Sequence, residues 1–204
     1  MHIIAILLQP GQPTEIAALV MAAGWASYGV ILVLGKRGAA PGSAKRDIRS
    51  TLGFALQCAA YAICFVFYRT YFSPIVPMSI PAETILAAIS IALTLWSVWF
   101  CYAAARALGK QWALMARVIE GHELIRQGPY AMVRNPIYLA MLLMLISIGM
   151  DVSRWPALAV ATVIFILGTL IRIRTEENLL RANFGAKFED YARSVPAFLP
   201  LKWR

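Results

Sequence analysis

The chain alternates between long apolar stretches and short polar segments. Five stretches carry almost no charged residue, and they cover residues 16–34, 51–68, 80–105, 136–150 and 156–171. A helix needs about 20 predominantly apolar residues to cross the hydrocarbon core of a bilayer. The pattern therefore predicts an all-α integral membrane protein with five transmembrane helices, the last two of which are short and form a hairpin.

Local signals sharpen these limits. Pro136 suits the first turn of the fourth helix, and a tight turn is expected at 151–155. The residues after 171 are adequate helix formers, so the fifth helix is expected to leave the membrane and continue to Gly185. The tail, 187–204, is amphipathic and suited to a membrane interface. Glu83 is expected at the outer interface.

Positive charge is distributed unevenly between the two predicted sides of the membrane. Of the 19 Lys and Arg residues, 17 lie in three segments on one side, 35–50, 106–135 and 172–204. Because cytoplasmic loops carry an excess of Lys and Arg, we predict an outside N-terminus and a cytoplasmic C-terminus. The membrane would be an inner, plasma or endoplasmic-reticulum-type membrane.

Composition supports this class of protein. Of the 204 residues, 60% are hydrophobic and only 14% are charged, which is too apolar for a soluble domain of this size. We expect a single domain over 1–204, with a three-helix N-terminal part (1–105) and a cofactor-binding catalytic part (106–204). The first residues lack a basic region and a cleavage site, so a removable signal peptide is not expected.

Several classes of function are disfavoured. The net charge of +9 sits in particular loops and not along one basic face, which argues against nucleic acid as a partner. The cysteines lie in apolar stretches without metal-ligand spacing, and His122 is the one histidine besides His2, so no metal site is predicted. The chain contains no G-x-G-x-x-G stretch, no P-loop and no G-x-S-x-G nucleophile elbow.

Two polar clusters stand out, at 120–138 and at 172–177. The predicted topology brings both to the cytoplasmic face. Tyr130 and Tyr138 offer flat faces with hydroxyl tips, and Asn135 offers an amide that pairs with an adenine edge. Together with the carboxylates of the second cluster, this composition suits a zwitterionic, aromatic ligand.

Plainer interpretations of the same residues stay open at this point. Tyr130 and Tyr138 equally suit an interfacial aromatic belt. Arg172 and Glu176 stand four residues apart, which also suits an ion pair on an exposed helix that contributes only about 0.2–0.5 kcal/mol.

The ordered motifs of the C-terminal half resemble those of the isoprenylcysteine carboxyl methyltransferase family and of the related phospholipid N-methyltransferases. The elements are H-E-L-I-R-Q-G-P-Y-A-M-V-R-N-P-I-Y at 122–138, R-T-E-E at 174–177, F-G-A-K-F-E-D-Y at 184–191 and V-P-A-F-L-P at 195–200. The likeness covers roughly the last 90 residues, from Ile119 on. Asn135 departs from the pattern, because the prenylcysteine enzymes usually carry histidine there.

The resemblance implies a cytoplasmic S-adenosylmethionine pocket formed by the 106–135 loop and the C-terminal helix, with a lipid substrate that enters from the bilayer. Arg172 matches the arginine on the substrate side and is the predicted catalytic residue. The residues that match the cofactor-binding positions are His122, Leu124, Ile125, Tyr130, Asn135, Pro136, Ile137, Tyr138, Glu176 and Glu177.

The sequence therefore predicts S-adenosylmethionine-dependent methyl transfer to a lipophilic acceptor, such as a prenylcysteine-type carboxylate or a similar isoprenoid or lipid group. Such a displacement requires alignment and partial desolvation of the reactants and no protein nucleophile. Sterol reductases share a similar C-terminal half, so a nicotinamide-dependent lipid reductase is the second possibility. A small transporter or scaffold is the third.

Overall fold

The computed structural model describes residues 12–38, 48–68, 80–109 and 124–200. Within these ranges, five long helices run along a bundle: α2 (Gln12–Gly38), α3 (Ile48–Val66), α4 (Ile80–Leu108), α5 (Pro136–Val152) and α6 (Trp155–Phe184). A 3₁₀ turn, η2 (Gly128–Ala131), precedes α5, and the short helix α7 (Ala186–Ser194) follows α6. The described residues form no strand, only an isolated bridge between Tyr68 and Ser153. The all-α prediction is confirmed.

Four of the described helices are long and apolar enough to cross a membrane, namely α2, α3, α4 and α6. Helix α5 has 17 residues, which corresponds to about 26 Å at a rise of 1.5 Å per residue. It is therefore shorter than the hydrocarbon core of a typical bilayer, which is about 30 Å thick. The structure thus supports four candidate spans, and a fifth full crossing by α5 stays a prediction.

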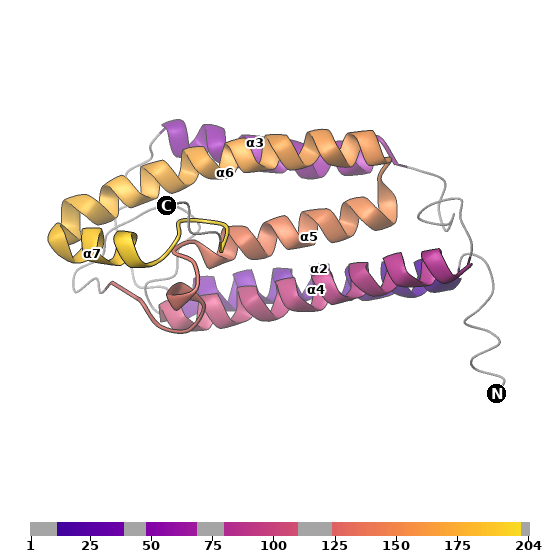
Figure 1. Cartoon of the computed structure of the whole chain (residues 1–204), viewed down its shortest axis with the longest axis horizontal. Coiled ribbons are helices and arrows are strands. Elements are labelled where there is room, and N and C mark those ends of the chain that lie inside the picture. Colours follow the sequence, from indigo (N-terminus) through magenta and orange to yellow (C-terminus); the bar gives the residue numbers. More distant parts are fainter. Residues whose placement is uncertain (1–11, 39–47, 69–79, 110–123, 201–204) are drawn as a thin grey trace.

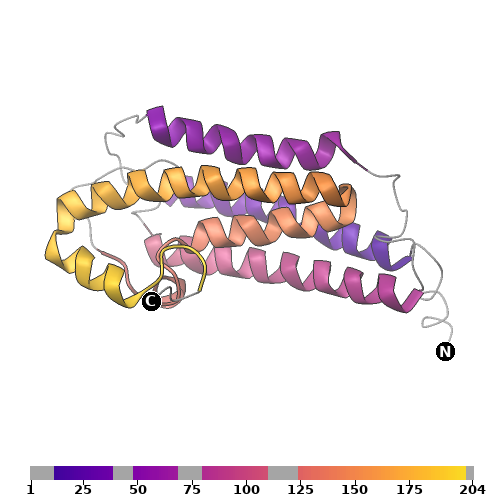
Figure 2. The same ribbon diagram turned by 45° about the horizontal axis from the view of Figure 1, so that its top comes forward.

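The bundle is arranged around α5. Helix α3 packs along α6, helix α2 packs along α4, and α5 lies between the two pairs (Figure 1). The rotated view separates α3 from α2, which lie in different pairs although they are consecutive in the chain (Figure 2). Eleven of the 17 residues of α5 are buried, so this short helix is the core of the described bundle.

Glycine allows the closest helix contact, between α3 and α6. A Cβ atom on Gly53 would lie 2.7 Å from the Gly168 carbonyl oxygen and 2.6 Å from Cγ of Arg172. A Cβ atom on Gly168 would lie 2.7 Å from the Gly53 carbonyl oxygen. Small residues let membrane helices approach in this way, and here they bring the backbone of α3 directly against the base of Arg172.

Hydroxyl groups join α4 to α5 inside the bundle. The hydroxyls of Thr94 and Ser147 lie 2.6 Å apart, and those of Ser90 and Ser147 lie 3.0 Å apart. Ser90 also donates to Oδ2 of Asp151 at 2.9 Å. In an apolar environment such bonds satisfy polar groups that would otherwise destabilise the helices. They fix α5 against the α2–α4 pair.

The helix ends differ from the predicted limits at the 35–50 loop and at the 151–155 turn. Helix α2 reaches Gly38 and α3 begins at Ile48, so both edges of the predicted 35–50 loop are helical. Helix α5 continues through Val152, which shortens the predicted 151–155 turn to Ser153 and Arg154. Glu83 is only 1% exposed, and its carboxylate accepts a 2.8 Å hydrogen bond from Thr14. Its expected place at the outer interface stays a prediction.

The extension of the last long helix is confirmed. Helix α6 continues to Phe184 and ends at Gly185, whose φ of 50° lies in the left-handed region that glycine adopts readily. The Gly185 amide donates to the Arg181 carbonyl oxygen at 2.9 Å and closes the last turn. This glycine lets the chain reverse into α7.

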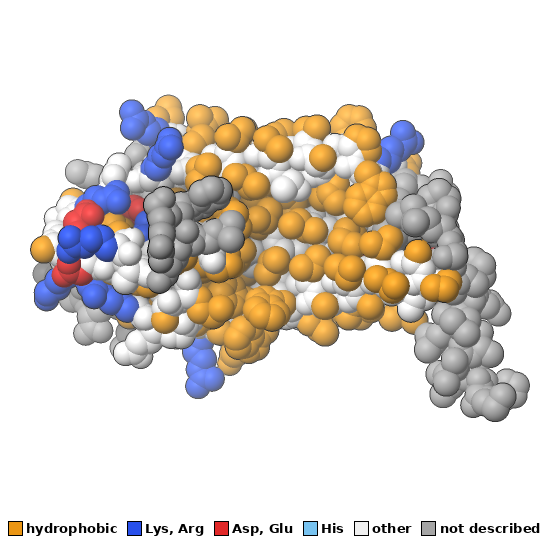
Figure 3. Space-filling model, viewed as in Figure 1, with side chains coloured by type: hydrophobic (Ala, Val, Ile, Leu, Met, Phe, Trp, Pro, Cys, Tyr) orange, Lys and Arg blue, Asp and Glu red, His pale blue; other side chains and the backbone are white. Residues whose placement is uncertain are grey.

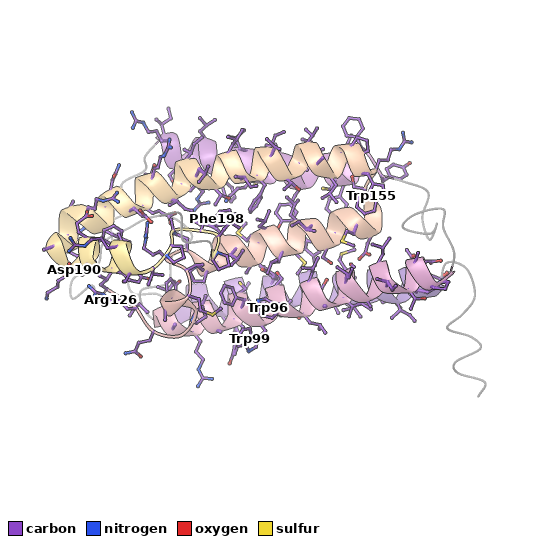
Figure 4. The ribbon with its side chains drawn as sticks, viewed as in Figure 1. Trp96, Trp99, Arg126, Trp155, Asp190 and Phe198 are labelled. Carbon is purple, nitrogen blue, oxygen red and sulfur yellow. The ribbon has the colours of Figure 1, made fainter. Side chains whose placement is uncertain are left out.

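Charged and aromatic side chains mark the ends of the bundle. On the face seen in Figure 3, Lys, Arg, Asp and Glu gather mainly at the end that carries α7, and hydrophobic side chains cover the middle. Trp96 and Trp99 extend outward from α4, and Trp155 lies toward the opposite end (Figure 4). All three are about half exposed, as aromatic residues near membrane interfaces often are.

Candidate active site

The start of α5 and the last turns of α6 meet at the charged end of the bundle, because the two helices run in opposite directions. Tyr138 donates its hydroxyl hydrogen bond to Oε1 of Glu176. Arg172 donates to the same oxygen through Nη2 at 3.5 Å, and its guanidinium lies 5.2 Å from the centre of the Tyr138 ring. We refer to Tyr138, Arg172 and Glu176 as the Tyr138 cluster.

Burial decides between the interpretations that the sequence left open. Tyr138 is 7% exposed and Tyr130 is 8% exposed, so neither belongs to an interfacial aromatic belt. The side chains of Arg172 and Glu176 are 5% and 22% exposed, so they are not an ion pair on an open helix surface. Glu176 is therefore the more exposed of the two charged side chains in the cluster.

A second group of polar side chains lies on the neighbouring side of α6. Arg134 donates through Nε to Oε1 of Glu177 at 2.8 Å and through Nη2 to Oε2 at 3.1 Å. This two-pronged geometry is the strong arrangement for an arginine and a carboxylate. The two side chains are only 11% and 7% exposed, so the pair is largely shielded from water.

The same arginine holds the segment that follows α7. Its Nη1 donates to the carbonyl oxygens of Ala192, at 2.9 Å, and Val195, at 2.5 Å. Its backbone amide donates to the Pro196 carbonyl at 2.9 Å, and the Asn135 amide nitrogen donates to the Ala197 carbonyl at 2.8 Å. We refer to Arg134, Asn135 and Glu177 as the clasp.

Helix α7 turns its apolar side toward the protein. Phe188 is fully buried, and its ring centre lies 6.0 Å from the Arg134 guanidinium. Tyr191 donates to the Tyr130 carbonyl oxygen at 2.6 Å. These buried aromatic residues cover η2 and the clasp, and the predicted place of the tail at a membrane interface stays a prediction.

Two tyrosine hydroxyls beside η2 remain protonated at neutral pH. Burial raises the pKa of Tyr191 to about 12, although the nearby guanidinium groups of Arg134 and Arg126 lower it. Burial also raises the pKa of Tyr130 well above its usual value, with a further increase from Tyr191 and Glu176. The Tyr191 hydroxyl therefore stays a hydrogen-bond donor and keeps α7 fastened to η2.

An apolar groove of about 450 Å³ lies next to the residues that follow η2, between α4 and α5. Its walls come from both helices and from the residues just after η2. They include Trp96, Phe100, Met132, Val133, Leu139 and Leu143.

The structure brings most of the predicted site residues to one end of the bundle, in different settings. Tyr138, Arg172 and Glu176 meet directly, and Asn135 and Glu177 belong to the clasp. Tyr130 and Pro136 are buried in η2 and in the first turn of α5. Leu124 and Ile125 lie half-buried before η2, and Ile137 lies half-buried in the first turn of α5. His122 lies outside the described residues.

Two contributions were missed from the sequence. Arg134 is the centre of the clasp but was not among the predicted site residues, although it stands in the recognised motif. On α3, Oε1 of Gln57 accepts from Nη1 of Arg172 at 3.4 Å, and the centre of the Phe54 ring lies 5.6 Å from the same guanidinium. For Gln57, the available signal was its amide side chain, which stands inside the otherwise apolar predicted span 51–68.

Residues 85–187, half of the chain, match the phospholipid methyltransferase family. The chain belongs to the phospholipid methyltransferase family. This match contains the whole Tyr138 cluster and the side chains of the clasp, whereas α2 and α3 lie before it. Isoprenylcysteine carboxyl methyltransferases belong to the same superfamily of membrane methyltransferases.

Two curated proteins are similar to part of the chain. The nickel-cobalt-cadmium resistance protein NccN of Alcaligenes xylosoxydans xylosoxydans is 35% identical over 94 residues, which are 46% of this chain and 44% of that protein. The cobalt-zinc-cadmium resistance protein CzcN of Cupriavidus metallidurans is 34% identical over 94 residues, 46% of this chain and 43% of that protein. The similarity thus spans less than half the length of these relatives.

Proposed function

We propose that this protein transfers a methyl group from S-adenosylmethionine to a lipophilic acceptor at the cytoplasmic face of a membrane. The observation that carries the proposal is the Tyr138 cluster, an accessible carboxylate between a buried tyrosine and a buried arginine, inside the segment that matches a methyltransferase family. Family membership favours methyl transfer over the nicotinamide-dependent reductase and over the transporter or scaffold.

The donor set fits a cofactor that carries an ammonium group and ribose hydroxyls. Among the described residues, Tyr138 and Arg172 both contact Oε1 of Glu176, so Oε2 is the oxygen that accepts from such a ligand. S-adenosylmethionine supplies an electrophilic methyl group on a sulfonium. Glu176 would hold its polar end, and Tyr138 would fix the Glu176 carboxylate. The other predicted cofactor residues, from His122 to Ile137, would form the surrounding wall.

Arg172 is proposed to face the acceptor. A guanidinium binds a carboxylate through paired hydrogen bonds, so a prenylcysteine-type carboxylate is the acceptor head that fits it best. Such an acceptor needs no general base, whereas an amine or a thiol has to lose a proton first. The apolar groove beside η2 supports an acceptor with a hydrocarbon part.

We further propose one domain over 1–204 that crosses the membrane five times, with its N-terminus outside and its C-terminus in the cytoplasm. The alternating directions of the helices and the excess of Lys and Arg at one end support this arrangement. Reporter fusions after Lys45, Met78, Gln111, Asp151 and Lys202 would then report inside, outside, inside, outside, inside. A cytoplasmic signal from the fusion at Asp151 would contradict five crossings.

The decisive experiment compares ligands on the purified protein. S-adenosylhomocysteine at a hundred times its Kd should stabilise the fold by about 2.7 kcal/mol, measured as a rise in the unfolding temperature, and NADPH should have no effect. Methyl transfer is then assayed with N-acetyl-S-farnesylcysteine and with phosphatidylethanolamine vesicles. Stabilisation by NADPH alone would replace this proposal with the reductase.

A further inference from the structure

Arg172 is enclosed by residues of α3 on the side away from Glu176. Gln57 is only 1% exposed and lies within the apolar length of α3. Its Oε1 accepts from Nη1 of Arg172 at 3.4 Å. The guanidinium lies between two rings, 5.2 Å from the centre of Tyr138 and 5.6 Å from the centre of Phe54.

Two partners on α6 fix the orientation of the Gln57 amide. A guanidinium only donates hydrogen bonds, so the oxygen of the amide has to face Arg172. The amide nitrogen then points to Thr169 and donates to its hydroxyl oxygen at 2.9 Å. Thr169 and Arg172 are three residues apart and therefore lie on the same face of α6. Gln57 thus joins α3 to the face of α6 that carries the arginine.

A close backbone contact between α3 and α6 lies next to Gln57 and Arg172. Gly53, one helical turn before Gln57, lies directly against Gly168, one residue before Thr169. A Cβ atom on Gly53 would also lie 2.6 Å from Cγ of Arg172, so the backbone of α3 lies directly against the side chain that Gln57 contacts. Helix α3 also lies before the segment that matches the family, residues 85–187.

We propose that Gln57 is a positioning residue that holds the Arg172 guanidinium between Phe54 and Tyr138, directed toward the site at Glu176. The inference rests on the proposed function only in giving Arg172 the task of facing the acceptor. Gln57 itself touches no substrate. It acts by restricting the rotation of the guanidinium on the side that faces α3.

Side-chain ¹⁵N NMR of arginine-labelled protein in nanodiscs tests the positioning without any assay of activity. The Arg172 signals are assigned with Arg172→Gln. In the parent protein, a guanidinium held on several sides should give separate Nη signals. In Gln57→Leu these signals should merge into one averaged signal, as for the exposed Arg193. Unchanged Arg172 signals in Gln57→Leu would overturn the proposal.

The matched control is Thr94→Val. It also removes a buried hydrogen bond between two helices, here α4 and α5, but at a distance in the chain from Arg172. Its Arg172 signals should remain as in the parent. If Thr94→Val merges them equally, the effect reflects general loosening of the bundle and the specific role of Gln57 is lost. Gln57→Glu retains an acceptor oxygen and should keep the Nη signals separate.

Kinetics then show whether the positioning matters for the reaction. With N-acetyl-S-farnesylcysteine as the probe, Gln57→Leu should raise KM roughly tenfold, because an Arg172 guanidinium that is free to rotate makes a weaker charge-assisted hydrogen bond to the acceptor. The Kd for S-adenosylhomocysteine should stay within about twofold, a separation that simple unfolding does not produce. An equal loss in both constants would contradict the assignment. A parent protein that methylates neither probe would refute the proposed function, while the NMR result would still decide the role of Gln57.

Discussion

The Tyr138 cluster and the clasp are built from adjacent carboxylates, yet their surroundings are opposite. Glu176 is 22% exposed and meets a tyrosine and an arginine through one oxygen, whereas Glu177 is 7% exposed and is held at both oxygens by Arg134. Consecutive residues of an α-helix point about 100° apart because a turn contains 3.6 residues. Helix α6 therefore directs Glu176 into the Tyr138 cluster and Glu177 into the shielded contact with Arg134.

This difference indicates how the site is kept in shape. The clasp closes the segment after α7 over η2 and the start of α5, which is the segment that carries Tyr138. The cluster can then keep one accessible carboxylate without losing its geometry. Rigid support around an accessible group is what a binding site requires. The comparison predicts that substitutions in the clasp act mainly on stability and substitutions in the cluster mainly on binding.

The largest effect is expected from Arg134→Gln. The substitution leaves the shielded Glu177 without its main partner, and breaking a buried pair in this way costs about 3–5 kcal/mol. Hydrogen exchange over residues 186–197 should accelerate strongly, and the unfolding temperature should fall. Arg134→Lys, which keeps the charge but loses the two-pronged geometry, should be intermediate. Unchanged exchange in Arg134→Gln would show that the clasp does not hold the tail.

Glu176→Gln should come next and should act on binding. The loss of a charge-assisted hydrogen bond of about 1.5–3 kcal/mol corresponds to a Kd for S-adenosylhomocysteine that is roughly ten- to hundredfold weaker. The unfolding temperature should stay near that of the parent. The matched variant is Glu177→Gln, which should destabilise the tail more than it weakens binding. Identical profiles for the two variants would remove the distinction between cluster and clasp.

Asn135→Ala should have a smaller effect. Its amide nitrogen makes one hydrogen bond to the Ala197 carbonyl oxygen, and such a bond contributes about 0.5–1.5 kcal/mol. We expect faster hydrogen exchange near residue 197 and a change in cofactor affinity of less than about tenfold. A loss of affinity as large as that of Glu176→Gln would move Asn135 from the clasp into direct contact with the cofactor.

The smallest effect is expected from Arg181→Ala. Arg181 lies 3.5 Å from Oε2 of Glu177 and 2.9 Å from Glu189, but its side chain is 42% exposed. Exposed pairs of this kind contribute about 0.2–1 kcal/mol. The unfolding temperature should barely change, and the remaining effect should vanish at high salt. A loss comparable to that of Arg134→Gln would make Arg181 the principal partner of Glu177.

Much of the fold could be predicted from the sequence, because the long helices coincide with long apolar stretches that proline and glycine bound. Pro136 and Gly185 mark the start of α5 and the end of α6 where expected. The direction of the tail could not be predicted, since an amphipathic helix suits a membrane surface and a protein surface equally well. The burial of Glu83 could not be predicted, because its partner, Thr14, is 69 residues away in the chain.

The site shows the same limit. The motifs identified the residues that gather at the charged end, but they did not separate Glu176 from Glu177, since their neighbours decide their roles. Arg134 pairs with Glu177 across 43 positions, and Gln57 reaches Arg172 across 115. Sequence patterns report periodicity within one helix and carry no information on which helices pack together.

The hairpin of α5 and α6 has a consequence for the way the chain is made. Only Ser153 and Arg154 separate the two helices. Because α5 is shorter than the hydrocarbon core, it would have a hydrophobic mismatch if it crossed a bilayer alone. We expect α5 and α6 to be inserted into the membrane as one unit. Helix α4 is synthesised earlier, so its hydroxyl groups are available to pair with those of α5. Glu176 and Glu177 lie in the second half of α6, so they are synthesised near the end of that unit. The proposed site is therefore complete only once the last part of this hairpin has been synthesised.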